Sequence, residues 1–108
     1  MARQLGQQYV TTGLVGMPAM RRAAECLRTL AHPHRLRIVE LLLSGERTVG
    51  ELAEACGIRS HVASEHLGKM KDRGLLECRR DGRRIYYRPA SQCLQGIIDC
   101  VKCHFGGA

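Results

Sequence analysis

Apolar residues recur every three to four positions along most of this chain, the spacing of a helix that buries one face. Met20, Ala24 and Leu27 begin the first such series. Between residues 75 and 89 the period changes to alternation, which is typical of strands. The pattern predicts five helices, over residues 18–31, 33–43, 49–56, 60–73 and 91–105, and two strands, over residues 75–80 and 83–89.

Residues with known capping preferences mark the boundaries of these helices. Pro18 and Pro33 suit the first turns of the first two helices, because proline has no N–H to lose there. Thr48 followed three residues later by Glu51 forms a capping box for the third helix. Gly74 ends the fourth helix, since glycine readily takes the left-handed conformation that follows a helix. These signals agree with the boundaries that the apolar period predicts.

The order of the elements predicts a winged helix-turn-helix. Two short helices flank the tight turn "CGIRS", and a hairpin with Asp81-Gly82 at its centre follows them. The expected fold class is therefore α+β and mainly helical, with five helices and a two-stranded β-hairpin wing. Residues 1–16 are expected to form a mobile arm, and residues 17–108 a DNA-binding and dimerisation domain.

Charge and length narrow the choice of partner and compartment. The 108 residues carry 17 Lys and Arg against 10 Asp and Glu, and a net charge of +7 favours a polyanion such as nucleic acid or an acidic membrane surface. No apolar run is long enough to cross a bilayer or resembles a signal peptide. The expected compartment is the cytoplasm, where thiols stay reduced, so the six cysteines do not imply disulfides.

The second helix of the helix-turn-helix and the wing carry the candidate DNA contacts. The start of that helix can enter a major groove, and the arginines of "RRDGRR" can clamp phosphates. Glu65 can accept from a cytosine amino group or pair with Lys69. The alternative is a solvated helix face and a charged hairpin that prevents edge pairing. The candidates are Arg59, Ser60, His61, Ser64, Glu65, Lys69, Lys71, Arg73, Arg80, Arg83 and Arg84.

Three stretches together resemble the ArsR/SmtB family of bacterial winged-helix repressors: "LAHPHRLRIVELLL", "TVGELAEACGIRSHVASEHLGKMKDRGLL" and "RRDGRRIYYR". The resemblance covers residues 24–104 without gaps. It implies a homodimer joined by the first and last helices, which binds double-stranded operator DNA until an inducer, commonly a metal or metalloid ion, releases it. A two-fold dimer is expected on a palindromic site.

The same resemblance implies that three known kinds of sensing site are incomplete here. Thr48, Gly50 and Ala53 stand where arsenic and cadmium sensors carry thiols. Cys93 and His104 occupy two ligand positions of the zinc sensors, but Ser91 and Gly107 replace the others. Persulfide sensors carry thiols where this chain has Glu40 and Gly106.

The last helix nevertheless gathers metal-ligand chemistry on one side. Cys93, Cys100 and His104 are spaced i, i+7 and i+11, so they lie close to one line along a helix, with Cys103 beside them. Cys93 and His104 are then about 16 Å apart and cannot share an ion within one chain. Across an antiparallel dimer they can meet. We expect sites for Zn(II), Cu(I) or As(III), shared across the dimer, at Cys93, Cys100, Cys103 and His104.

Other interpretations of these residues stay open. Cys100 and Cys103 can form a redox switch without a metal, with Lys102 lowering the thiol pKa. Cys100, Cys103 and His104 also match the C-x-x-C-H pattern of covalent haem attachment, which occurs in exported proteins. All four residues can simply pack an interface. Cys26 is expected at an interface or in the core, Cys56 and Cys78 in the core, His32 and His34 as turn and cap residues, and His66 against backbone.

The sequence thus predicts a transcriptional regulator rather than an enzyme. The leading interpretation is a homodimeric repressor that an inducer, acting at the last helix, releases from operator DNA. Two alternatives remain: a constitutive DNA-binding protein without a ligand, and a small thiol-disulfide oxidoreductase that uses the Cys100–Cys103 dithiol.

Overall fold

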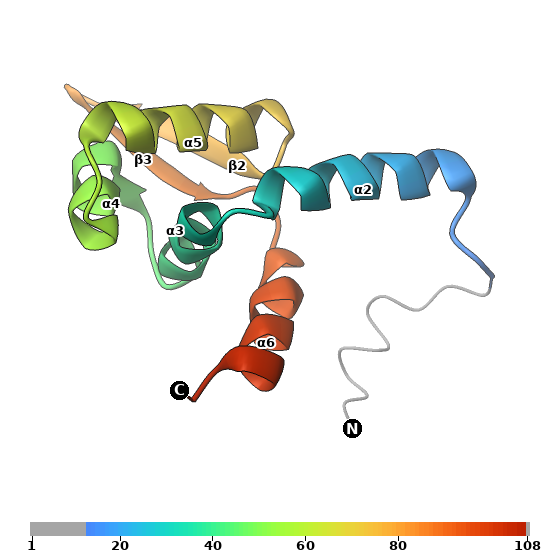
Figure 1. Cartoon of the computed structure of the whole chain (residues 1–108). Coiled ribbons are helices and arrows are strands. Elements are labelled where there is room, and N and C mark those ends of the chain that lie inside the picture. The colour runs from blue at the N-terminus through green and yellow to red at the C-terminus, as the bar shows by residue number, and fades with distance from the viewer. Residues whose placement is uncertain (1–12, 108) are drawn as a thin grey trace.

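The computed structural model describes residues 13–107, and within them three of the five helices pack against a small three-stranded sheet while the first and last helices project from this body (Figure 1). Residues 1–12, most of the predicted arm, and residue 108 lie outside the described residues. The elements are α2 (Met17–Leu30), α3 (Pro33–Leu43), β1 (Arg47–Thr48), α4 (Val49–Cys56), α5 (Ser60–Asp72), β2 (Leu76–Asp81), β3 (Arg84–Pro89) and α6 (Leu94–Phe105).

The core lies where α3, α4 and α5 meet the sheet and α6. Ile38, Leu52 and Leu67 are fully buried there, each contributing about 1.5–3 kcal/mol relative to an exposed side chain. On α3, Ile38, Val39 and Leu42 are buried, and Leu36 and Leu43 are half-buried. This helix packs on α4, α5, α6 and β3, so more than one of its faces is covered.

The helix-turn-helix forms as its capping signals predict. The Thr48 hydroxyl accepts a hydrogen bond from the Glu51 N–H at 3.2 Å, and the Glu51 carboxylate accepts one from the Thr48 N–H at 2.8 Å. Gly57 ends α4 with a φ of +67°, a conformation that costs glycine little. The chain therefore leaves α4 at Gly57, before α5 begins. The predicted capping box is confirmed.

The wing differs from the prediction in two details. Asp81 pairs with Arg84, so the two-residue turn consists of Gly82 and Arg83 rather than Asp81 and Gly82. Of these two turn residues, only Gly82 has a positive φ, which fits a type II′ turn. The sheet also has a third strand, because Arg47–Thr48 pairs with β3. Two residues are too few to show an alternating pattern, so this strand has no signal of its own in the sequence.

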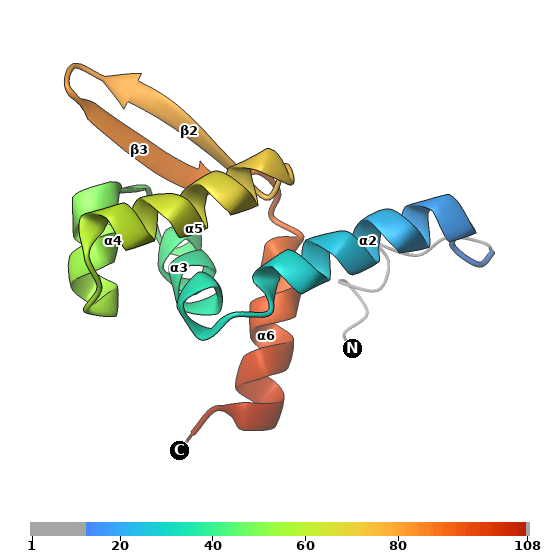
Figure 2. The same cartoon turned by 45° about the horizontal axis from the view of Figure 1, so that its top comes forward.

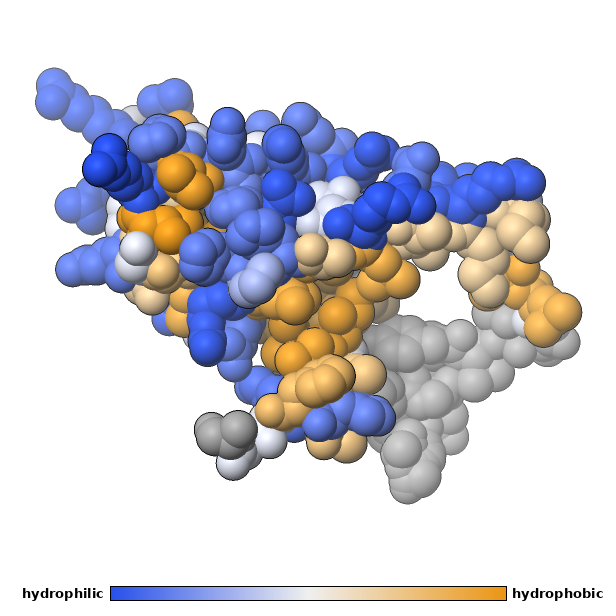
Figure 3. Space-filling view, viewed as in Figure 1, coloured by the Kyte–Doolittle hydropathy of each residue, from blue (hydrophilic) through white to orange (hydrophobic). Residues whose placement is uncertain are grey.

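The two helices at the ends of the described chain diverge from the body. Figures 1 and 2 show α2 extending to one side and α6 pointing away from the sheet, while the β2–β3 hairpin has its tip at the α4 end. Only Leu30 is buried on α2, and Met20 and Leu27 are about half exposed, at 48% and 52%. Figure 3 shows apolar atoms gathered where α2 and α6 converge. Within residues 13–107, Met20 and Leu27 of α2 and Phe105 of α6 are therefore left exposed.

The last helix begins later than predicted. Its first helical residue is Leu94, and Cys93 stands at the N-cap position. Ser91 accepts a hydrogen bond from the Cys93 N–H at 3.1 Å, so it satisfies one amide of the turn that precedes the helix. Within residues 13–107 no helix has the length and apolar character that a membrane span requires.

Candidate nucleic-acid interface

The helix α5 separates a polar outer face from a buried inner one. Ala63, His66, Leu67 and Met70 are buried, Val62 and Gly68 are half-buried, and the remaining positions of the helix are exposed. The predicted contact residues on this segment are all exposed: Arg59 at the N-cap, then Ser60, His61, Ser64, Glu65, Lys69 and Lys71, and Arg73 at the C-cap. The outer face therefore offers hydroxyl, imidazole and ammonium groups on one surface, and Figure 3 shows this side largely hydrophilic.

Three of these residues behave differently from the expectation. Glu65 and Lys69 form no ion pair within the part of the chain described, so the predicted i, i+4 pair is not made. Arg73 pairs with Glu25 of α2 at 2.7 Å, and its carbonyl lies 3.9 Å from the Cys26 thiol as an acceptor. Arg73 thus ties the end of α5 to α2.

The arginines of the wing fall into two classes. Arg79 donates to the Glu46 carboxylate at 2.8 Å and stacks on the Tyr86 ring at 4.7 Å, and this hydrogen bond with Glu46 raises the pKa of Arg79. Arg88 pairs with Glu77 at 3.1 Å and with Glu46 at 3.7 Å. These two side chains hold the wing against the loop that follows α3.

The second class lies at the tip. Arg80, Arg83 and Arg84 are exposed and take part in no ion pair among residues 13–107. An open hollow of about 300 Å³ lies beside them, and Thr48 and Gly50 at the start of α4 form its other wall. Arginine side chains therefore line one side of the hollow and the N-terminal end of α4 lines the other. Both carry positive charge or partial charge, which favours the binding of an anion. The residues that line it are Thr48, Val49, Gly50, Arg83, Arg84 and Ile85.

The capping carboxylate beside this hollow stays ionised. The hydrogen bond from the Thr48 backbone N–H lowers the pKa of Glu51 below its ordinary value of 4.5, and the positive charges of Arg84 and Arg47 act in the same direction. Glu51 is therefore a fixed negative charge at the start of α4 at neutral pH, and it limits how far an anion can approach the helix end.

A polar contact inside the fold joins α3 to α5. His66 is 8% exposed, and its Nδ1 accepts a hydrogen bond from the Arg35 Nε–H at 3.0 Å, while Arg35 also donates to the Thr29 carbonyl at 2.9 Å. Burial lowers the pKa of His66, and the nearby charges of His32 and Arg35 add to this effect. The expectation that His66 contacts backbone was wrong, because its partner is a side chain from a distant helix.

The predicted tail ligands are exposed but separate within one chain. Cys93, Cys100, Cys103 and His104 all lie on the surface, and the His104 Nδ1 is 3.3 Å from the Cys100 carbonyl. They form no group that could hold a metal ion within a single copy of the described chain. The three residues that do form such a group are His32, His34 and His66.

The other cysteines are half-buried rather than fully in the core. Cys56 packs against the core, and its burial raises the thiol pKa. Cys78 lies opposite Tyr87 in the wing and is also half-buried, since a hairpin that projects from the body is covered on one side at most. His32 accepts a hydrogen bond from the His34 N–H at 3.1 Å as the N-cap of α3, so its predicted capping role is confirmed.

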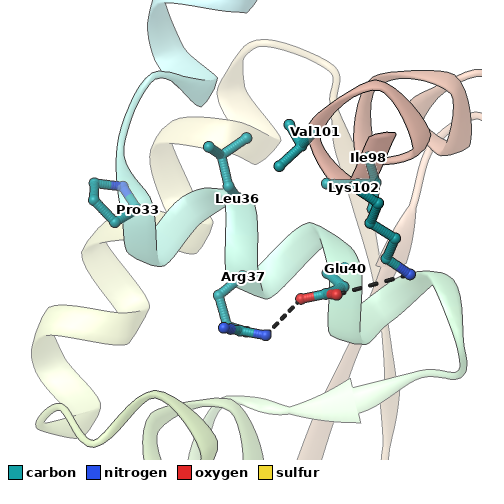
Figure 4. Close-up of a pocket in the computed structure, with 7 residues that line it drawn as sticks. All are labelled: Pro33, Leu36, Arg37, Glu40, Ile98, Val101 and Lys102. Carbon is teal, nitrogen blue, oxygen red and sulfur yellow. Dashed lines mark hydrogen bonds and ion pairs between the residues drawn. The ribbon is translucent and has the colours of Figure 1, made fainter. Parts of the chain in front are cut away.

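A small cavity separates α3 from α6 (Figure 4). Its volume is about 140 Å³, and Leu36, Ile98 and Val101 form its apolar wall. Glu40 lies between Arg37, at 2.7 Å, and Lys102 of α6, at 3.8 Å. A carboxylate therefore links the two helices at a position where persulfide sensors of the resembled family carry a thiol.

Comparisons with known proteins agree with this geometry. A family described as a helix-turn-helix domain matches residues 30–79. A biofilm growth-associated repressor of Agrobacterium fabrum is 37% identical over 97 residues, which cover 86% of this chain and 83% of the relative.

Solved structures extend the likeness to the whole described fold. The homodimeric winged helix-turn-helix DNA-binding domain Mb0332 of Mycobacterium bovis, a possible ArsR-family regulator, is 34% identical with a TM-score of 0.72, covering 86% of this chain and 88% of its own. NolR of Sinorhizobium fredii is 31% identical with a TM-score of 0.76, covering 91% of this chain and 100% of its own. The second helix of the helix-turn-helix, α5, called the recognition helix below, and the β2–β3 wing are present as the sequence predicts. The chain belongs to the ArsR family of winged helix-turn-helix, DNA-binding transcriptional regulators.

Proposed function

We propose that this chain acts as a homodimeric repressor, which binds a palindromic operator and leaves it when an inducer acts on α6. One observation carries the proposal: α5 and the wing tip present exposed basic groups on one side, while Met20 and Leu27 of α2 and Phe105 of α6 stay exposed among residues 13–107. The first surface suits DNA and the second suits another copy of the chain. A DNA-binding role of this kind places the protein in the cytoplasm.

The dimer buries the apolar faces of the two terminal helices. Met17, Met20 and Leu27 line α2, and Phe105 at the end of α6 is 77% exposed. Exposed apolar groups clustered in this way are typical of subunit interfaces. A homodimeric relative supports the same arrangement. Two-fold symmetry then requires two half-sites in the DNA, spaced by about one helical turn.

Each subunit contributes two kinds of contact. Ser60, His61 and Ser64 on the first turns of α5 reach base edges in the major groove, and Arg59 and Lys69 hold the flanking phosphates. Arg80, Arg83 and Arg84 of the wing bind phosphates alongside, in or near the hollow next to α4. Lys71 and Arg73 lie at the far end of α5, so they contribute mainly to the positive field. Glu65 selects against bases that lack an amino donor.

The inducer acts on the thiols and imidazole of α6. Cys93 of one subunit and Cys100, Cys103 or His104 of the other supply sulfur and nitrogen ligands, which fit Zn(II), Cu(I) or As(III). Binding of the ion fixes the angle between the two subunits and moves the recognition helices out of register with the grooves. A coupling of about 1–3 kcal/mol between the two sites is sufficient for such a switch.

A redox inducer uses the same residues without a metal. A two-electron oxidant such as hydrogen peroxide would take two electrons from the Cys100 and Cys103 thiolates and join them in a disulfide. The two residues stand one helical turn apart in α6, so the bond forms only when that turn unwinds. The unwinding alters the same dimer interface.

A fluorescence anisotropy titration tests the proposal, with a palindromic duplex selected from random sequence. We expect specific binding that Zn(II), Cu(I), As(III) or peroxide weakens at least about fivefold, the lower end of usual coupling. Cys93→Ser should keep DNA binding and lose the response to metals, whereas Cys78→Ser, a thiol in the wing, should keep both. Binding that no inducer changes favours a constitutive DNA-binding protein. Thiol-disulfide turnover without DNA binding favours an oxidoreductase.

A further inference from the structure

Three histidines from two separate segments meet beneath the recognition helix. His32 is the N-cap of α3, His34 lies in the first turn of α3, and His66 lies in the middle of α5. One nitrogen from each ring lies within 4.8 Å of the others. The ring centres of His32 and His66 are 4.5 Å apart, and that of His34 lies 5.5 Å from His32 and 6.0 Å from His66. His66 is buried and the other two are half-buried.

This donor set matches the chemistry of borderline divalent metal ions. Neutral imidazole suits Zn(II), Ni(II), Co(II) and Cu(II), and three histidines leave one position open for water. In a tetrahedral site with bonds of about 2.05 Å the nitrogens are about 3.4 Å apart, so nitrogens that now lie within 4.8 Å of one another must approach by at most about 1.4 Å. His34 can supply most of that movement, because its ring takes part in no hydrogen bond among residues 13–107.

The ion must compete with two donors for lone pairs on these rings. The lone pair on Nδ1 of His66 accepts the Arg35 Nε–H, and that on Nδ1 of His32 accepts the His34 backbone N–H. A neutral imidazole has only one such lone pair. Arg35 keeps its hydrogen bond to the Thr29 carbonyl when it releases His66, so the guanidinium still has a hydrogen-bond acceptor. Glu65, whose charge acts on His66, partly offsets the positive charges.

We propose that His32, His34 and His66 bind one divalent metal ion of the Zn(II), Ni(II) or Co(II) type in each chain. The site is separate from the thiols of α6 and complete in a single subunit. It joins the α2–α3 turn to the recognition helix, and it replaces the Arg35–His66 hydrogen bond as the link between them. Its existence does not depend on dimerisation, on the operator or on the inducer proposed for α6.

Titration with Co(II) alone tests the site, because the spectrum of this ion reports its ligands. The protein should be full-length, untagged and reduced, with the triple substitution Cys93→Ser, Cys100→Ser and Cys103→Ser to remove the α6 thiols. We expect one Co(II) per chain, visible bands of a four-coordinate or five-coordinate ion, and no sulfur-to-cobalt charge-transfer band. Absence of stoichiometric binding, or a charge-transfer band, would overturn the proposal.

A single substitution then assigns the ligands. In the same triple-serine background, His34→Ala should weaken Co(II) binding more than about tenfold, since even indirect partners of metal ligands have effects of this size. Its melting temperature without metal should stay unchanged, because the His34 ring is half-buried and makes no hydrogen bond in the described chain. His61→Ala on the exposed face of α5 and His104→Ala on α6 are matched controls and should bind Co(II) as the parent does. Equal affinity in His34→Ala and these controls contradicts the assignment.

Discussion

The side of the molecule formed by α5 and the wing, and the side formed by the terminal helices, differ in how many of their polar and apolar groups have partners within residues 13–107. On the first side, Glu46 holds Arg79 and Arg88, the capping box closes α4, and the inner face of α5 is buried. On the second side, apolar groups of α2 and α6 remain exposed. One chain thus forms the DNA-binding surface proposed above. The surface proposed for dimerisation, which would set the position of one DNA-binding surface relative to the other, stays exposed.

This difference has a consequence for regulation. A surface that is already closed changes little when a small ligand binds nearby, whereas an interface between subunits has alternative arrangements of similar energy. The exposed thiols of α6 lie on the open side. The proposed inducer therefore acts where the structure is least fixed by its own chain.

Substitution on the open side should have the largest effect. Leu27→Glu places a carboxylate on the exposed apolar face of α2, where the proposed dimer would bury it without a partner. We expect monomers in sedimentation experiments and a loss of operator affinity of roughly a thousandfold, toward non-specific binding. Arg22→Glu, on the polar side of the same helix, should remain dimeric. A dimeric Leu27→Glu protein would place the interface elsewhere.

Substitution of the unpaired wing arginines should have the next largest effect. Arg83→Ala combined with Arg84→Ala removes four arginines from the proposed dimer, two in each subunit. It should weaken binding to specific and random duplexes alike and reduce the slope of log K against log salt by about 3.6, roughly 0.9 for each phosphate contact. Arg88→Ala removes an arginine that already pairs with Glu46 and Glu77, and it should leave that slope unchanged. The test is a series of anisotropy titrations at increasing salt. Equal slopes for the two variants would refute the division of the wing arginines into two classes.

A smaller effect is expected from the helix cap on the closed side. Thr48→Ala removes the hydroxyl that accepts the Glu51 N–H and should lower the free energy of unfolding by about 1 kcal/mol. Thr29→Ala makes the same chemical change inside α2, where the hydroxyl bonds the Glu25 carbonyl and alanine is the better helix former. Urea denaturation of both variants measures the difference. A Thr48→Ala protein as stable as Thr29→Ala would show that the cap contributes nothing.

The smallest effect concerns pH. The folded pKa of Glu51 is lowered by the Thr48 backbone N–H, so the unfolded chain binds more protons than the folded one near pH 4. The contribution of this carboxylate is fully present above its ordinary pKa of 4.5 and is lost as the pH falls through the lower, folded value. Glu51→Gln should therefore show a shallower loss of stability below pH 4.5 in urea denaturation. Parallel pH profiles for the two proteins would count against this linkage.

The parts of the fold that the sequence predicts are those set by neighbours along the chain. Thr48 and Glu51 are three residues apart, and Gly57 ends the helix that they begin, so their roles follow from local geometry. The hairpin follows from alternation and a glycine, although its turn is displaced by one residue. In each case the interacting groups are close in sequence.

The features that the sequence did not predict are contacts between distant segments. Nothing local marks Glu46 as the partner of Arg79, Glu25 as the partner of Arg73, or β1 as a third strand. His66 lies 31 residues from Arg35, its partner, and alternation or helical period carries no information about such a pair. The tail thiols were identified by type and spacing, and their meeting across a dimer stays a prediction.

Sedimentation velocity of the reduced protein with a fluorescent palindromic duplex tests the central claim most directly. We expect a complex of two chains per duplex that dissociates as salt rises, because two basic surfaces release counterions together. The free protein should sediment as a dimer. A free protein that stays monomeric and binds no duplex even at low salt would contradict a dimeric DNA-binding regulator.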